Sequence, residues 1–195
     1  MPLVLQAPRG EGLHASAIYG SLYQKLDPER FPEGSKPHTI SMAIGLAWEQ
    51  WLERTLIGMG QLVCRPGELT SPEGILYSPD LFVANCEDRV GEIKTTMLSS
   101  KLGIEGPKCD KYHCQAKIYC YWSGTFHARF YVLFLRGDYS FMKKGADRDD
   151  LGMSDLRCYD VTYTPRELME NYVMLMNHAI KQNMFIRHGL CNPTL

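Results

Sequence analysis

Charged residues interrupt apolar runs in the segment Ser78 to Lys94, SPDLFVANCEDRVGEIK. Asp80 comes directly before the apolar run Leu81 to Ala84, and Glu92 and Lys94 flank an isoleucine in a run that is typical of a strand. The residues NCED between the two runs favour a turn. An antiparallel hairpin that turns near Cys86 would place Asp80 directly opposite Glu92, with Lys94 on the same face.

Directly opposed carboxylates repel each other unless a cation lies between them, because their Cβ atoms are roughly 4.5–5.5 Å apart. Mg²⁺ meets this need, since proteins hold it with one or two carboxylates, water and substrate phosphate. The alternative is a solvated hairpin with ordinary charges. A register slip of one residue would also send Glu92 and Lys94 to the other face.

The remaining sequence predicts an α/β fold in one domain of residues 1–195, with a central mixed β-sheet flanked by helices. Helical periodicity, caps and breakers predict helices at residues 14–26, 39–57, 110–122 and 164–187. Strand-forming runs occur at residues 61–65, 81–84, 89–95, 126–135 and 157–163. The last helix has a clear start, because Thr164, Pro165 and Glu167 form a capping-box pattern.

Composition sets the class of protein. The chain has 195 residues, of which 45% are apolar and 22% charged, as in ordinary globular proteins. We find no apolar run near the roughly 18 residues of a membrane span and no signal-peptide pattern. Seven cysteines, an odd number, favour reduced thiols and a cytoplasmic location. A net charge of −1 neither indicates nor excludes a nucleic-acid partner.

Three motifs together resemble the PD-(D/E)xK nuclease superfamily. Ser78 to Asp80 and Glu92 to Lys94 resemble its SPD and EIK signature. GLAWEQWL, Gly45 to Leu52, resembles the upstream helix motif of the RecB-like branch, and QAKIY, Gln115 to Tyr119, matches its QxxxY motif. That branch includes RecB-type and phage exonucleases. The resemblance implies a restriction-endonuclease-like catalytic core at about residues 39–135, between helical terminal segments.

The resemblance also implies roles for individual residues. Asp80 and Glu92 would bind Mg²⁺ or Mn²⁺ together with the carbonyl oxygen of Ile93. Glu49 would approach from its helix as a further ligand or as an anchor for water. Glu53, one turn later on nearly the same face, is the other candidate for this role. The alternative is that Glu49 is an ordinary exposed carboxylate of its helix. Lys94 would orient or deprotonate the attacking water or offset charge on the phosphate.

Four residues are expected to contact DNA. Gln115 and Tyr119 share one face of their helix, and Lys111 lies one turn earlier on the same side. Ser78 begins the SPD motif. Without the resemblance, an ordinary helix stripe would explain Gln115 and Tyr119 equally well, and lysine runs are often only solvated faces. His14, at the start of the first predicted helix, is a further residue to consider.

The cysteines do not follow the pattern of RecB-like nucleases that hold an iron–sulfur cluster. Those enzymes have three closely spaced cysteines after QxxxY, and no such trio is present here. We therefore do not expect an iron–sulfur cluster. Cys109, His113 and Cys114 could offer zinc ligands, but no CxxC pair accompanies them, and buried thiols are the simpler interpretation.

Taken together, the residues and the resemblance predict a metal-dependent DNA exonuclease that acts from DNA ends in phage-type recombination, repair or DNA processing. Its partners would be DNA and a single-strand annealing or recombinase protein, and we expect no association with a membrane. Two alternatives remain open: a structure-specific or restriction-type endonuclease, and a DNA-binding module of the same fold without catalysis. The sequence leaves the oligomeric state open.

Overall fold

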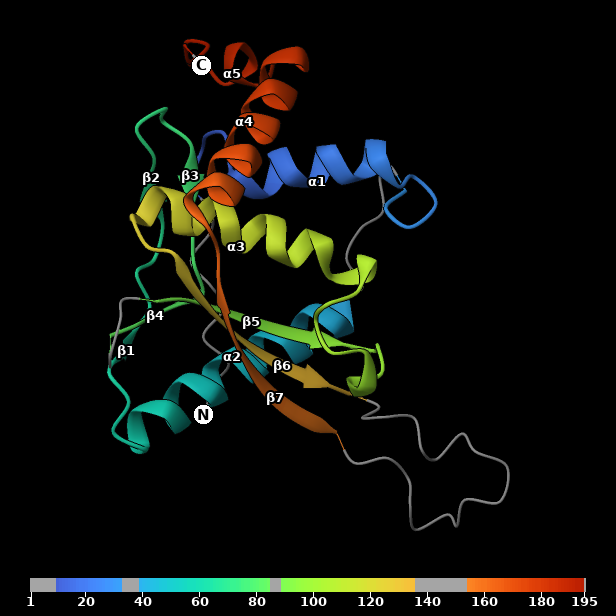
Figure 1. The fold of residues 1–195 in the computed structure, drawn as a ribbon. Helices are drawn as coiled ribbons and strands as arrows, with labels where there is room; N and C mark the ends of the chain where they lie inside the picture. Colours follow the sequence, from blue (N-terminus) through green and yellow to red (C-terminus); the bar gives the residue numbers. More distant parts are fainter. Residues whose placement is uncertain (1–9, 33–38, 85–88, 136–153, 195) are drawn as a thin grey trace.

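A five-stranded mixed sheet lies at the centre of the molecule, with strand order β1-β4-β5-β6-β7 (Figure 1). The computed structural model describes residues 10–32, 39–84, 89–135 and 154–194. β5 and β6 are parallel, and the other neighbouring strands are antiparallel. The strands are β1 (Val63–Cys64), β4 (Leu81–Val83), β5 (Arg89–Thr96), β6 (His127–Phe134) and β7 (Asp155–Thr162). The predicted α/β fold with a central mixed sheet is confirmed.

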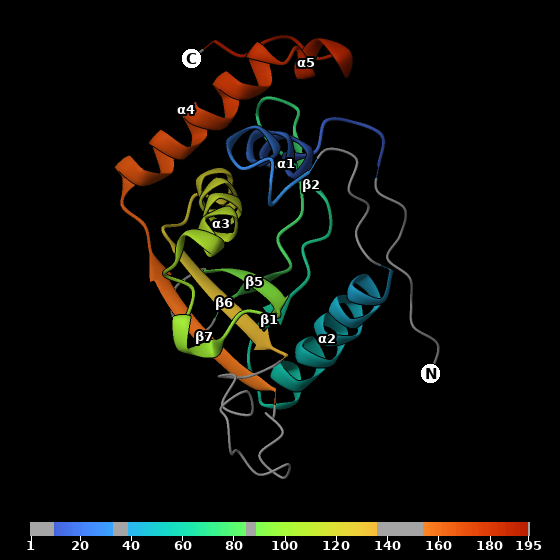
Figure 2. The same cartoon turned by 90° about the vertical axis from the view of Figure 1, so that its right-hand side faces the viewer.

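Helices cover both faces of this sheet. α1 (Ala15–Leu26) and α3 (Asp110–Ser123) lie on one side with α4 (Pro165–Lys181), whereas α2 (Thr39–Gly58) lies on the other (Figure 2). The larger hydrophobic core fills the space between the sheet and α1, α3 and α4. A smaller core joins α2 to the opposite face. None of the described helices combines the length and apolar character that crossing a membrane requires.

Local signals explain where two of these helices end or begin. Thr164 caps α4: its hydroxyl accepts from the Glu167 N–H, and the Glu167 carboxylate accepts from the Thr164 N–H. This is the predicted capping box. α3 ends at Gly124, whose φ of +69° lies in the left-handed region that glycine adopts without strain. The chain then turns directly into β6.

Gly91 allows β4 and β5 to pair tightly beside the acidic residues. A Cβ atom at Gly91 would lie 2.9 Å from the Cβ of Leu81, its partner across the antiparallel pair. Contacts that short are absent between real side chains. The glycine in GEIK therefore keeps the two strands in register one residue before Glu92.

Three sequence predictions need correction. The predicted strand at residues 61–65 is only β1, because Gly60 (φ +77°) and a hydrogen bond from the Gln61 N–H to the Leu56 carbonyl use Gln61 to close α2. A separate two-stranded sheet, β2 (Leu69–Thr70) and β3 (Leu76–Tyr77), was not predicted.

The third correction concerns the last helix, which was expected to continue to residue 187. α4 stops at Lys181 because Asn183 adopts a left-handed conformation with φ +53°. A short helix, α5 (Met184–Arg187), follows. Two short 3₁₀ helices, η1 (Ser100–Leu102) and η2 (Pro107–Cys109), connect β5 to α3. The predicted NCED turn lies outside the described residues.

Candidate active site

The β4–β5 pair brings Asp80 and Glu92 together in the predicted way. Leu81 pairs with Gly91, and one further step of the same register places Asp80 opposite Glu92. The predicted hairpin register is therefore confirmed. Glu92 is completely buried, and the Asp80 side chain retains 19% of its exposure. Two carboxylates thus face each other just before the start of β4, where the loop from β3 enters this strand.

Lys94 supplies the positive charge that these carboxylates need. Its Nζ lies 2.5 Å from Glu92 Oε2 and 3.7 Å from Asp80 Oδ2, and its side chain is 15% exposed. The ammonium also lies 5.9 Å from the centre of the Tyr112 ring, within reach of a cation–π interaction. The protein therefore carries an internal cation between the opposed acids.

Burial and mutual repulsion alter the protonation of this group of residues. Desolvation raises the pKa of Glu92 to about 8, with further increases from Asp80 and Glu49, although Lys94 opposes the shift. The two carboxylates raise the pKa of Lys94 above its ordinary value, against the effect of burial. Lys94 is consequently charged at neutral pH, whereas Glu92 can gain or lose a proton there.

Glu49 joins this group from α2. Burial raises its pKa to about 7, and Asp80 contributes by repulsion, which shows that the two carboxylates interact. A Cβ atom at Gly45 would lie 3.7 Å from Thr95 Oγ1, so α2 runs close to β5 one turn before Glu49. Glu53, the rival on the same face, instead forms a 2.6 Å ion pair with Arg65. The geometry therefore favours Glu49 over Glu53 as the third acid.

The backbone of Ile93 completes the acidic end of the sheet. Its N–H donates a 2.7 Å hydrogen bond to Asp80 Oδ2. In an antiparallel pair, the N–H and C=O of one residue point to the same neighbouring strand. The carbonyl oxygen of Ile93 therefore also faces the edge where Asp80 lies, while its side chain packs in the smaller core below α2.

The oxygen donors of this site fit a hard divalent cation. Glu92 Oε1 and Glu49 Oε2 are both buried, and neither has a hydrogen-bond partner among the described residues. Buried carboxylate oxygens without partners are costly unless a cation or another donor satisfies them. As the side chains stand, no three of the described His, Cys, Asp and Glu residues converge closely enough to enclose a metal ion. Carboxylates with one carbonyl are nonetheless the donor set that Mg²⁺ and Mn²⁺ prefer.

The residues expected to contact DNA lie beside this site and differ in how deeply they are buried. Ser78 is exposed in the loop before Asp80. Lys111 lies over the rings of Phe31 (4.7 Å) and Tyr19 (5.8 Å), and burial together with repulsion from Lys94 and Arg30 lowers its pKa. Lys111 therefore lies near enough to Lys94 for the two charges to interact.

Gln115 and Tyr119 form a buried connection on α3. The Gln115 amide donates to the Tyr119 hydroxyl at 3.4 Å, and Tyr119 is only 3% exposed. Tyr119 also interacts electrostatically with Glu92 and Lys94. In this conformation Gln115 is partly exposed, whereas Tyr119 is buried beside it.

Three of the cysteines and His113 have structural surroundings, whereas Cys64, Cys158 and Cys191 are exposed. Cys109, Cys114 and Cys120 are buried, and His113 bonds to the Tyr163 hydroxyl and the Ile104 carbonyl. His14 lies at the start of α1, where its ring bonds to the Gly10 carbonyl and lies 3.5 Å from Glu68. These contacts give both histidines structural roles.

Arg65 is the residue near the site that the motif analysis missed. It follows β1 and forms ion pairs with both Glu49 and Glu53. The available signal in the sequence was a pair of glutamates one helical turn apart, followed by a lone arginine after the next strand. No local pattern shows that these three side chains meet, because they meet only when α2 packs against the sheet edge.

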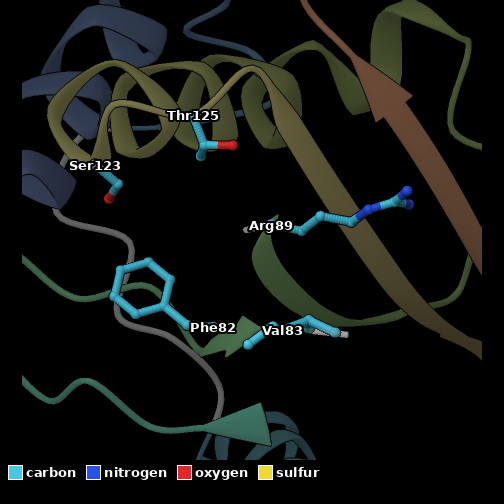
Figure 3. A pocket seen from close by; sticks show the side chains of 6 residues that line it. Phe82, Val83, Arg89, Ser123 and Thr125 are labelled. Carbon is cyan, nitrogen blue, oxygen red and sulfur yellow. The ribbon is translucent and has the colours of Figure 1, made fainter. Parts of the chain in front are cut away.

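A separate hollow of about 290 Å³ lies near the first residue of β5, lined by Phe82, Val83, Ala84, Arg89, Ser123 and Thr125 (Figure 3). It contains none of the acidic residues described above. The site is therefore defined by its charged side chains and not by this cavity.

Similar structures were found only through the fold. No protein-family model and no curated protein matches the sequence. LHK-Exo in complex with dAMP aligns with a TM-score of 0.53 at 16% identity, covering 91% of this chain and 90% of that chain. A phage related exonuclease from Haemophilus somnus 129PT gives a TM-score of 0.54 at 12% identity, covering 85% and 78%.

A second structure of LHK-Exo, an alkaline exonuclease from Laribacter hongkongensis, covers 95% of this chain and 85% of its own at 18% identity, with a TM-score of 0.49. The two similarities with a TM-score above 0.5 concern the fold of the chain. They agree with the mixed sheet flanked by helices. The protein therefore has the PD-(D/E)xK nuclease fold.

Proposed function

We propose that this protein is a metal-dependent deoxyribonuclease that hydrolyses phosphodiester bonds from DNA ends. The observation that carries the proposal is the buried pair of opposed carboxylates, Asp80 and Glu92, with the ammonium of Lys94 in contact with both. Such an arrangement costs stability, since buried charges are expensive to desolvate. A requirement for catalysis explains why the chain retains it.

Asp80, Glu92, Glu49 and the Ile93 carbonyl would hold Mg²⁺ or Mn²⁺. When bound, such a cation polarises the phosphoryl oxygen and lowers the pKa of a coordinated water. Lys94 then has two possible duties, to orient or deprotonate the attacking water or to offset negative charge on the phosphate. Its contacts with both carboxylates keep it within reach of either.

Substrate contacts come from the loop before Asp80 and from α3. Ser78 and Gln115 would donate hydrogen bonds to phosphate oxygens, and Lys111 would supply charge. Tyr119 would hold Gln115 and the site carboxylates in place from the core, in line with its burial. Contacts of this kind are independent of base sequence, which suits an enzyme that degrades a strand.

Action at DNA ends is the finer part of the proposal. The similar structures include an exonuclease in complex with dAMP and a phage related exonuclease. By analogy, we place this protein in phage-type recombination, repair or DNA processing. A single-strand annealing or recombinase protein would then receive the strand that it exposes.

Digestion of linear and covalently closed circular DNA in Mg²⁺, Mn²⁺ or EDTA tests the proposal. Wild type should degrade linear DNA only with a divalent cation and leave circles intact. Glu92→Gln and Lys94→Met should abolish degradation. Glu170→Gln is the matched control, because Glu170 is exposed on α4 and paired with Arg166; it should retain full activity.

The other outcomes select the alternatives. Cleavage of circles by wild type, lost in Glu92→Gln, would indicate a structure-specific or restriction-type endonuclease. Binding of DNA without cleavage under every metal condition would overturn the enzymatic proposal and leave a DNA-binding module.

A further inference from the structure

Two glutamates of α2 share one arginine at the edge of the candidate active site. Glu49 and Glu53 are one helical turn apart and therefore lie on the same face of the helix. Arg65 Nε lies 2.6 Å from Glu53 Oε2, and Arg65 Nη1 lies 3.6 Å from Glu49 Oε2. All three side chains are partly buried, with exposures of 29% for Arg65, 19% for Glu49 and 25% for Glu53.

The sheet fixes the position of this arginine. β1 pairs with β4 through Val63 and Val83 and through Cys64 and Phe82. One further step of this register places Arg65 beside Leu81, the residue that follows Asp80. The guanidinium is therefore anchored on the strand next to the catalytic strands, and it reaches from there to α2.

The two ion pairs differ in kind. The contact with Glu53 is a close hydrogen bond. The contact with Glu49 is too long for a hydrogen bond, and Glu49 Oε2 has no hydrogen-bond partner among the described residues. Glu53 thus fixes Arg65 by a hydrogen bond, whereas the contact of Arg65 with Glu49 is longer and mainly electrostatic. The lone pairs of Glu49 Oε2 stay available for a different cation.

We propose that Arg65 is a positioning residue: held by Glu53, it keeps the Glu49 carboxylate turned toward Asp80 and Glu92 so that Oε2 can bind a divalent cation. This inference rests on the proposed function, since it assigns Glu49 to the metal. It extends the metal site beyond its ligands to a supporting ion-pair chain, Glu53–Arg65–Glu49. Partners of ligands in this position typically change metal affinity by about 10–100-fold.

The planar fork of arginine is central to this role. One guanidinium can contact two carboxylates at once with a fixed geometry, whereas a lysine ammonium on its flexible stem cannot reproduce the fork. The charge of Arg65, considered without its positioning effect, predicts the opposite change in metal affinity. A guanidinium repels a divalent cation, so loss of its charge without loss of positioning would tighten metal binding.

Titration of the full chain with Mn²⁺ by calorimetry, without DNA, tests the inference. Arg65→Met should raise the Kd for Mn²⁺ about 10-fold, and Arg65→Lys should remain clearly weaker than wild type. Arg54→Met is the matched control, because Arg54 lies on α2 with an exposed side chain; its Kd should equal that of wild type. An unchanged or lower Kd in Arg65→Met would overturn the inference, as would full recovery in Arg65→Lys.

A double-mutant cycle separates positioning from a general loss of structure. Glu49→Gln should weaken Mn²⁺ binding on its own, and adding Arg65→Met to it should cause no further loss, because the residue to be positioned is gone. Additive losses would overturn the inference. Thermal unfolding monitors the fold of each variant. If Arg65→Met fails to fold, Glu53→Gln takes its place, with a weaker Kd expected and an unchanged Kd counting against the inference.

The same variants distinguish the two proposals. Arg65-dependent Mn²⁺ binding in a protein that cuts no DNA would retain the inference and remove the proposed function. DNA cleavage whose Mn²⁺ requirement is identical in Arg65→Met and wild type would do the reverse.

Discussion

Two charge clusters on the central sheet differ in their balance of charge: one has two acids and one base, and the other has two bases and one acid. The buried charge cluster consists of Asp80, Glu92 and Lys94, and the exposed charge cluster consists of Arg89, Arg129 and Asp160. Glu92 and Arg89 are three residues apart on β5, so alternation places them on opposite faces of the sheet. Glu92 is completely buried, whereas the Asp160 side chain is 50% exposed.

Hydrogen bonding separates the clusters further. Both oxygens of Asp160 are bonded to Arg129, at 2.6 and 2.8 Å, and Oδ1 also lies 2.6 Å from Arg89. The hydrogen bond from Arg129 lowers the pKa of Asp160 to about 2. Burial instead raises the pKa of Glu92, and one of its oxygens has no hydrogen-bond partner among the described residues. The exposed charge cluster is thus a set of satisfied ion pairs, whereas the buried charge cluster keeps a carboxylate oxygen that a further donor or a cation could satisfy.

The largest expected effect is on the rate of DNA cleavage, which should depend on the buried charge cluster and not on the exposed one. Glu92→Gln should lower the rate of DNA cleavage at saturating metal by about 10³-fold, because it removes a proposed ligand of the cation that stabilises charge in the transition state. Asp160→Asn should leave the rate unchanged. Single-turnover digestion of end-labelled linear DNA measures both. Equal losses in the two variants would mean that the contrast between the clusters does not concern catalysis.

Stability should respond next most strongly, to loss of the buried cation. Lys94→Met leaves Glu92 buried without its counter-charge, and breaking such a pair typically costs about 3–5 kcal/mol. Adding Glu92→Gln should recover most of this loss, because the uncompensated charge disappears. Urea denaturation in EDTA at pH 9, above the pKa of about 8 at which folded Glu92 loses its proton, provides the free energies of unfolding. A double variant no more stable than Lys94→Met alone would contradict this explanation.

The fold was predictable wherever local patterns and tertiary packing agree. The strand-forming runs of β5 and β6 and the capping box at Thr164 act locally, and each appears where expected. The two-residue strands β2 and β3 carry too little pattern to detect. The break at Asn183 was missed because left-handed asparagine is an uncommon helix stop that no glycine or proline announces.

The site was predictable through its strand register and not through its supporting contacts. One assumed turn position was enough to align Asp80 with Glu92 and to place Lys94 on their face. The sequence called for a cation beside the opposed acids, and in this structure Lys94 lies in contact with both of them. The pairing of Arg65 with Glu49 depends on how α2 lies on the sheet, which no short motif encodes.

A smaller effect should appear in the pH dependence of the metal-free protein. The pKa of folded Glu92 is about 8, above the ordinary 4.5, so its contribution to stability is complete below about pH 4.5 and is lost as the pH rises through about 8. Lys94, whose pKa is raised, stays charged throughout this window. The melting temperature of wild type should therefore fall relative to Glu92→Gln between pH 5 and pH 8 in EDTA. A constant difference would show that Glu92 does not titrate in this range.

The smallest effect should come from the exposed cluster. Asp160→Asn should destabilise the protein by about 0–1 kcal/mol at pH 7, since solvent screens a half-exposed ion pair. The pKa of folded Asp160, about 2, is below the ordinary 3.8, so its contribution is present above about pH 3.8 and is lost as the pH falls through about 2. The difference between wild type and Asp160→Asn in urea should shrink at high salt and vanish near pH 2. A destabilisation by Asp160→Asn as large as that by Lys94→Met would contradict the distinction between the clusters. The half-exposed ion pair would then contribute as much stability as the buried one.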